Sequence, residues 1–109
     1  MCESVDLQTL KGQVAGSDAL LLYVTTTDCS VCKVLKPKVA EPLAERFPKV
    51  GFLDVEMDLL PEVGRHYEVF AVPTVIGFFQ GKEHFRKVRV FGLEELAEAL
   101  SRPYYLLFS

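Results

Sequence analysis

The chain of 109 residues contains no tryptophan, only two histidines and only three cysteines. Its 12 basic and 15 acidic residues are interleaved and give a net charge of -3, which excludes the basic surface typical of nucleic-acid-binding proteins. Its longest apolar runs, residues 19–24 and 104–108, are far shorter than the roughly 20 residues that a membrane-spanning helix needs. The sequence therefore predicts no nucleic-acid partner and no membrane association.

A secretion signal is also missing, because no basic segment followed by an apolar one comes after Met1. Three is an odd number of cysteines, which argues against the disulfide framework of a small secreted domain. We therefore expect a cytoplasmic protein, or a mature form whose leader has been removed. The isolated Cys2 is expected to be an incidental exposed thiol near a frayed terminus.

Half of the residues are hydrophobic and a quarter are charged, which is typical of one compact domain. A chain of this size buries roughly two-thirds of its unfolded surface, so its core needs no disulfide support. We predict a single domain over residues 1–109, ending in an apolar tail at residues 103–109. Because an exposed apolar tail is unfavourable, it should dock on its own domain, which favours a monomer; a homodimer through the tail is the alternative.

The spacing of apolar residues predicts alternating helices and strands. Helical spacing occurs over residues 5–14, 31–47, 61–67 and 93–100. Apolar runs predict strands at residues 19–25, 50–57, 74–79 and 83–90, the first two of them buried and the last two joined by a tight turn at Gln80-Gly81. This order predicts an α/β fold with a central mixed sheet of about four strands, a parallel βαβ start, an antiparallel C-terminal hairpin and helices on both faces.

The run Cys29-Ser30-Val31-Cys32 lies where a predicted strand ends and a helix begins. A structural zinc site needs four ligands, and the third cysteine and the two histidines lack metal-ligand spacing, so we expect no metal and no cofactor. Helix-terminal amides would stabilise a thiolate on Cys29 and lower its pKa. Cys32, one turn further, would be more buried and stay protonated longer. The pair is interpreted as a redox dithiol with an attacking and a resolving cysteine.

The run TTTDCSVCK at residues 25–33, Pro37, and the run AVPT at residues 71–74 together resemble the thioredoxin family. The resemblance covers about residues 20–100 in element order, and the cysteine pair combined with Val72-Pro73-Thr74 is its most specific part. It implies that Pro73 follows a cis peptide bond and lies against the cysteines, and that the backbone of Val72 pairs with an extended substrate segment. It also implies a substrate-binding surface that includes Asp28, Ser30, Val31, Val72 and Thr74.

The resemblance implies a thiol-disulfide oxidoreductase that reduces or exchanges protein disulfides in cell redox homeostasis. Cys29 would attack the substrate disulfide, and Cys32 would then attack Cys29 and release the reduced substrate. An external reductase or a small thiol must restore the dithiol, because the chain has no glycine-rich nucleotide-binding motif.

Several residues depart from the family pattern. Asp28 replaces the usual tryptophan before the first cysteine, and its charge opposes a thiolate on Cys29 unless the carboxylate is well solvated. Tyr23 occupies the place of a buried acid, and Asp54 falls where the family often has a lysine. We expect Asp54 to hydrogen-bond Tyr23 and to act through water on the proton of Cys32.

Two other functions stay open at this point. The first is a redox-inactive interaction module on the same fold, since a fold does not determine a function and the surroundings of the cysteines are atypical. The second is a metal or iron-sulfur site shared by two copies through paired C-x-x-C motifs.

Overall fold

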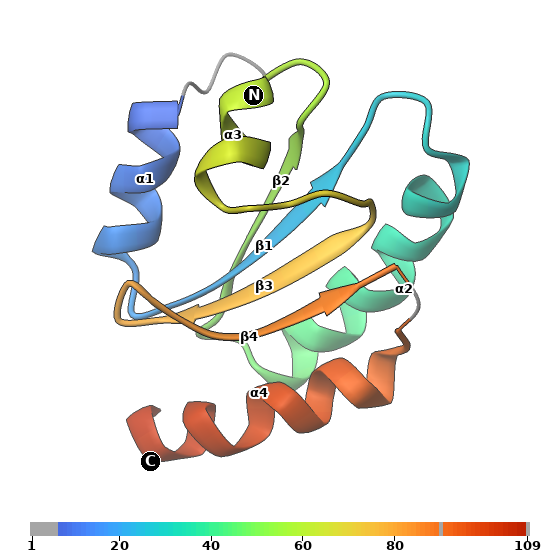
Figure 1. Cartoon of the computed structure of the whole chain (residues 1–109). Helices are drawn as coiled ribbons and strands as arrows, with labels where there is room; N and C mark the ends of the chain where they lie inside the picture. Colours follow the sequence, from blue (N-terminus) through green and yellow to red (C-terminus); the bar gives the residue numbers. More distant parts are fainter. Residues whose placement is uncertain (1–6, 90, 109) are drawn as a thin grey trace.

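The structure is a computed structural model that describes residues 7–89 and 91–108. Cys2 lies outside these residues. In chain order the elements are α1 (Leu7–Gly16), β1 (Ala19–Thr25), α2 (Ser30–Arg46), β2 (Gly51–Glu56), α3 (Pro61–His66), β3 (Thr74–Phe79), β4 (Lys82–Val88) and α4 (Leu93–Phe108) (Figure 1). No helix in the described part of the chain is both long and apolar enough to cross a membrane.

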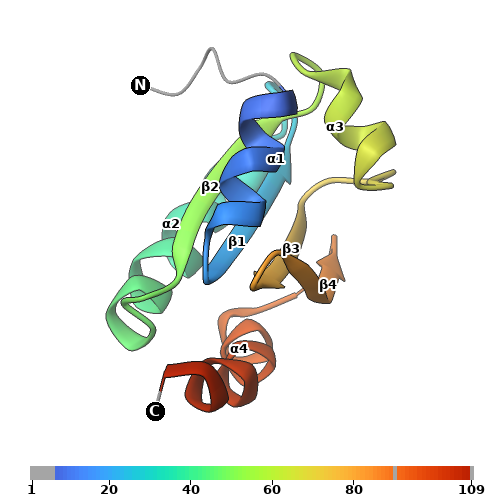
Figure 2. The same cartoon turned by 90° about the vertical axis from the view of Figure 1, so that its left-hand side faces the viewer.

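The four strands form one mixed sheet in the order β2-β1-β3-β4. β1 pairs in parallel with β2 and antiparallel with β3, and β3 pairs antiparallel with β4. Helices α1 and α3 cover one face of the sheet, and α2 and α4 cover the other, so that α1 lies in front of the strands and α2 behind them in Figure 2. The predicted mixed sheet with helices on both faces is confirmed.

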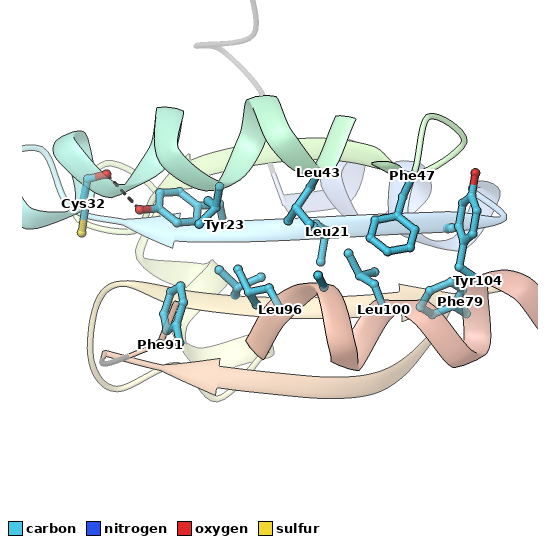
Figure 3. Close-up of a cluster of buried hydrophobic side chains, with 14 residues drawn as sticks. Leu21, Tyr23, Cys32, Leu43, Phe47, Phe79, Phe91, Leu96, Leu100 and Tyr104 are labelled. Atoms are coloured by element: carbon cyan, nitrogen blue, oxygen red, sulfur yellow. Dashed lines mark hydrogen bonds between the residues drawn. The ribbon is translucent and has the colours of Figure 1, made fainter. Parts of the chain in front are cut away.

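The central strand β1 is buried along its whole length. Successive side chains of a strand point to opposite faces, so Leu21 and Tyr23 join the core beneath α2 and α4 (Figure 3), while Leu20 and Leu22 join the core beneath α1 and α3. This two-sided burial explains why the run from residue 19 to residue 24 is continuously apolar.

The prediction that residues 50–57 form a buried strand is wrong in one respect. β2 lies at the edge of the sheet, and its residues are exposed or only partly buried, with Asp54 exposed. The parallel connection through α2 places β2 outside β1, where the helices of both faces cover it incompletely. Its apolar residues Phe52, Leu53 and Val55 pack only against the margins of the two cores.

The β3–β4 hairpin turns at Gln80 and Gly81, as predicted. Both residues have a positive φ, of 55° and 80°, the left-handed backbone that the two central residues of a type I′ turn require. β4 begins at Lys82 and ends at Val88, so the predicted strand over residues 83–90 is displaced by one to two residues at each end. Val90 itself is outside the described residues.

The expected apolar tail at residues 103–109 is not a separate segment as far as the structure describes it, because α4 continues through Phe108. Pro103 removes one helical hydrogen bond, yet the helix continues beyond it. The ring of the buried Tyr104 packs edge-on against Phe47, with 5.0 Å between ring centroids, which docks this part of α4 on its own domain. Leu106, on the outer side of the helix, is 75% exposed.

Candidate active site

Cys29 is the N-cap residue of α2, at the end of the short loop that follows β1. Its Sγ accepts a hydrogen bond from the backbone N–H of Cys32, with 3.2 Å between nitrogen and sulfur. The sulfur therefore lies at the end of the helix where unpaired amide groups carry partial positive charge. This position agrees with the one predicted from the sequence.

Cys29 and Cys32 are joined by a disulfide in the structure, and their Cα atoms are 5.3 Å apart, within the normal range for disulfides. The two residues differ in burial. Cys32 is 1% exposed and belongs to the core beneath α2 and α4, whereas Cys29 is only partly buried at the margin of that core. The prediction that Cys32 is more buried than Cys29 is confirmed.

The loop between β1 and α2 is held by Asp58, a residue that the sequence analysis did not select. Both carboxylate oxygens of Asp58 accept the backbone N–H of Thr27, at 3.1 and 3.2 Å. A side-chain hydrogen bond with Thr27 lowers the pKa of Asp58 below its usual value, and the backbone amides of Thr27, Asp58 and Leu59 lower it further. Its position in the sequence could have indicated this role. Asp58 follows β2, whose carboxyl end lies beside that of the parallel strand β1.

The Val72–Pro73 peptide bond is cis, and Pro73 is buried. The pairing of Thr74 with Val24 places this loop at the same edge of the sheet at which β1 leads into the cysteines. Val72 and Cys29 both pack against the core beneath α2 and α4. Within residues 7–89 and 91–108, no hydrogen bond engages the backbone of Val72.

The predicted substrate-binding residues fall into two groups. Asp28, Ser30 and Val31 are exposed around the partly buried Cys29. Thr74 is 1% exposed, and its hydroxyl donates to the carbonyl oxygen of Ala71 at 2.7 Å. The Thr74 hydroxyl thus supports the turn before Pro73, and substrate binding by Thr74 stays a prediction.

Phe70 is a further surface residue that the sequence analysis missed. It is 87% exposed and precedes Val72 by two residues. It borders a hollow of about 360 Å³ whose other walls include Thr26 and Asp58 of the active-site loops and Met57. Single-sequence reasoning offers no signal for it, because a phenylalanine next to a buried strand is normally expected in the core.

The expected hydrogen bond between Asp54 and Tyr23 is contradicted. The Tyr23 hydroxyl donates to the carbonyl oxygen of Cys32 at 2.9 Å, and a phenol has only one proton to donate. Asp54 instead forms an ion pair with Lys36 of α2. Asp54 and Tyr23 are register partners on β2 and β1, but a lysine from the helix above the strand engages the carboxylate.

No group of three or more histidine, cysteine or acidic side chains converges in the described residues in a way that could hold a metal ion.

Comparisons with known proteins agree with this geometry. The Thioredoxin family model matches residues 2–102. The thioredoxin-like protein YdfQ of Bacillus subtilis is 31% identical over 85 residues, which cover 78% of this chain and 75% of that protein. A thioredoxin of Echinococcus granulosus is 32% identical over 99 residues, 89% of this chain and 92% of its own length.

Solved structures show the same fold. Mitochondrial thioredoxin 3 from Saccharomyces cerevisiae in its oxidised form superposes with a TM-score of 0.75 at 22% identity, over 88% of this chain and 89% of that one. Plasmodium falciparum thioredoxin gives a TM-score of 0.78 at 15% identity, over 89% and 93% of the two chains. With a family model that spans nearly its whole length and a cysteine pair joined at the start of α2, the chain belongs to the thioredoxin family of thiol-disulfide oxidoreductases.

Proposed function

We propose that the chain reduces protein disulfides in two exchange steps, with Cys29 as the attacking and Cys32 as the resolving cysteine. One observation carries the proposal: the Sγ of Cys29 accepts the amide of Cys32 at the start of α2, while Cys32 lies behind it and is buried. An amide directed at the sulfur favours the thiolate, which is the nucleophile in disulfide exchange.

In the first step the Cys29 thiolate attacks one sulfur of the substrate disulfide. A bond forms between Cys29 and that sulfur, the substrate disulfide breaks, and the other substrate sulfur leaves as a thiolate that takes a proton from water. In the second step Cys32 attacks the Sγ of Cys29, forms the internal disulfide and releases the remaining substrate sulfur. The substrate gains two electrons, and the dithiol of the chain loses them.

The substrate segment would bind in an extended form along the backbone of Val72, whose N–H and C=O groups have no hydrogen-bond partner in the described part of the chain. The exposed side chains of Val31 and Phe70 would contact apolar residues of the substrate. Since main-chain hydrogen bonding does not depend on the substrate's sequence, this binding mode would accept many different protein disulfides.

The internal disulfide must be reduced again before the next turnover. We propose that an external reductase or a small thiol does this by attack on Cys29, because the sulfur of Cys32 is buried. We also propose that the chain works in the cytoplasm, a compartment that keeps thiols reduced. Fractionation of cells with an antibody to the chain tests the location, and recovery from a secreted fraction would contradict it.

Reduction of insulin by dithiothreitol tests the enzymatic proposal. The parent chain should accelerate the reaction, and Cys29→Ser should reduce it to the rate of dithiothreitol alone, because the attacking sulfur is lost. Cys2→Ser is the matched control, since it removes the one cysteine that does not belong to the C-x-x-C motif, and it should leave the rate unchanged. Equal rates for the parent and Cys29→Ser would sink the enzymatic proposal and favour an interaction module.

A further inference from the structure

Tyr23 connects the central strand to the first turn of α2. Its side chain is fully buried, and its hydroxyl donates to the carbonyl oxygen of Cys32 at 2.9 Å (Figure 3). Its ring packs against Phe52 of the neighbouring strand, with 5.8 Å between ring centroids. The phenol thus points from β1 directly at the resolving cysteine and is held in place by the core around it.

The protonation state of the Tyr23 hydroxyl does not change near neutral pH. Burial, and after it the negative charge of Asp54, raises the pKa of Tyr23 to about 12. Asp54 is the register partner of Tyr23 on the neighbouring strand β2, and its carboxylate forms an ion pair with Lys36 of α2. Tyr23 therefore stays a neutral hydrogen-bond donor and cannot accept a proton from Cys32.

We propose that Tyr23 is a positioning residue for the resolving step, which holds the carbonyl group of Cys32 so that its sulfur stays opposite Cys29. This inference rests on the proposed function. While a substrate is attached to Cys29, no disulfide joins the two cysteines, and the first turn of α2 must keep its place by other contacts. The hydrogen bond from the Tyr23 hydroxyl ties that turn to strand β1 at Cys32, the residue whose sulfur must react.

The reaction that Tyr23 assists is the attack of the Cys32 thiol on the mixed disulfide. A bond forms between the sulfurs of Cys32 and Cys29, and the bond between Cys29 and the substrate sulfur breaks. The proton of Cys32 ends on the released sulfur, either directly or through water. Tyr23 exchanges no proton in this step, so its contribution is geometric.

The symmetrical aromatic disulfide 5,5′-dithiobis(2-nitrobenzoate) separates the two steps in one stopped-flow trace. Attack by Cys29 releases one coloured thiolate, and resolution by Cys32 releases a second. All variants carry Cys2→Ser, so that no third thiol contributes. At high reagent concentration the second phase no longer depends on concentration and reports the resolving step.

We expect Tyr23→Phe to slow the second phase about fivefold and to leave the first phase unchanged. This factor corresponds to the loss of about 1 kcal/mol, a typical net value for one hydrogen bond. Tyr67→Phe is the matched control, because it removes the hydroxyl of a partly buried tyrosine that packs against Phe78 in the core on the other face of the sheet, and it should change neither phase. The pH profile of the second phase should keep its shape in Tyr23→Phe from about pH 6 to about pH 9.

Three results would overturn the positioning role: an unchanged second phase in Tyr23→Phe, equal slowing in Tyr67→Phe, or an inflection in the parent's pH profile that Tyr23→Phe abolishes. The last would make Tyr23 part of a proton relay. A parent that releases only one thiolate would instead contradict the proposed function itself. If Tyr23→Phe does not fold, 3-fluorotyrosine at position 23 replaces it; this stronger donor should accelerate the second phase, and an unchanged rate would overturn the proposal.

Discussion

The backbone N–H of Thr27 points at both carboxylate oxygens of Asp58, at 3.1 and 3.2 Å. This contact ties the loop before Cys29 to the loop that follows β2. Two segments that are 31 residues apart in sequence are thereby joined beside Cys29 at the start of α2.

Asp58→Asn should lower stability at neutral pH and not at acidic pH. The pKa of Asp58 is lowered in the folded chain, so its stabilising contribution is present above the unfolded value near pH 4 and is lost as the pH falls through the folded value. Urea unfolding at about pH 7 and about pH 3 measures the difference between parent and variant. The difference should disappear at the lower pH, and a difference of equal size at both would contradict the assignment.

Tyr23→Phe should destabilise the chain by about 1 kcal/mol at neutral pH, because it deletes the hydrogen bond to Cys32. The folded pKa of about 12 lies above the unfolded value near 10, so this tyrosine favours the folded state below about pH 10 and loses that contribution as the pH rises towards 12. Parent stability should therefore fall faster than that of the variant in this range. Urea unfolding at a series of alkaline pH values measures these stabilities, with Tyr105→Phe, at an exposed tyrosine, as the control. A difference in unfolding free energy between parent and Tyr23→Phe that stays constant over this range would refute the prediction.

Phe70→Ala should weaken substrate binding without affecting folding. The side chain is 87% exposed, so its removal costs the core nothing, but a substrate loses an apolar contact beside Val72. We expect KM for insulin to rise about fivefold and kcat to stay constant, in line with the loss of one apolar interface contact. Leu59→Ala is the matched control, since Leu59 is also exposed but does not line the hollow beside Phe70. Equal effects of the two substitutions would contradict a specific role for Phe70.

Tyr104→Ala should destabilise the chain by roughly 3 kcal/mol, the range for a large buried aromatic side chain. Tyr104 is buried against Phe47 and Phe108, whereas the nearby Leu106 is exposed, so Leu106→Ala should cost little. Thermal unfolding of both variants tests this contrast. If Leu106→Ala proves as damaging as Tyr104→Ala, the exposed side of α4 must be covered in solution, and sedimentation at several concentrations would then detect the dimer.

Local chemistry in the sequence determined much of this protein. The alternation of apolar runs predicted the element order, because a strand buried on both faces must be apolar at every position, as residues 19–24 are. The glycine in the Gln80-Gly81 turn adopts a backbone that other residues resist, so the hairpin could be read directly. The spacing of Cys29 and Cys32 at the junction of a strand and a helix predicted the cysteine pair and the deeper burial of Cys32.

Tertiary structure alone decided which groups surround that pair. Nothing in the sequence places β2 at the sheet edge, since Phe52, Leu53 and Val55 read like core residues wherever their strand lies. The partners of Asp54, Tyr23 and Asp58 depend on which elements cross above each strand, and a hydrogen bond between residues far apart in sequence leaves no periodic signal in the chain. A side chain's neighbours are set by packing in three dimensions, and for this reason the sulfurs were predictable while the groups that hold them were not.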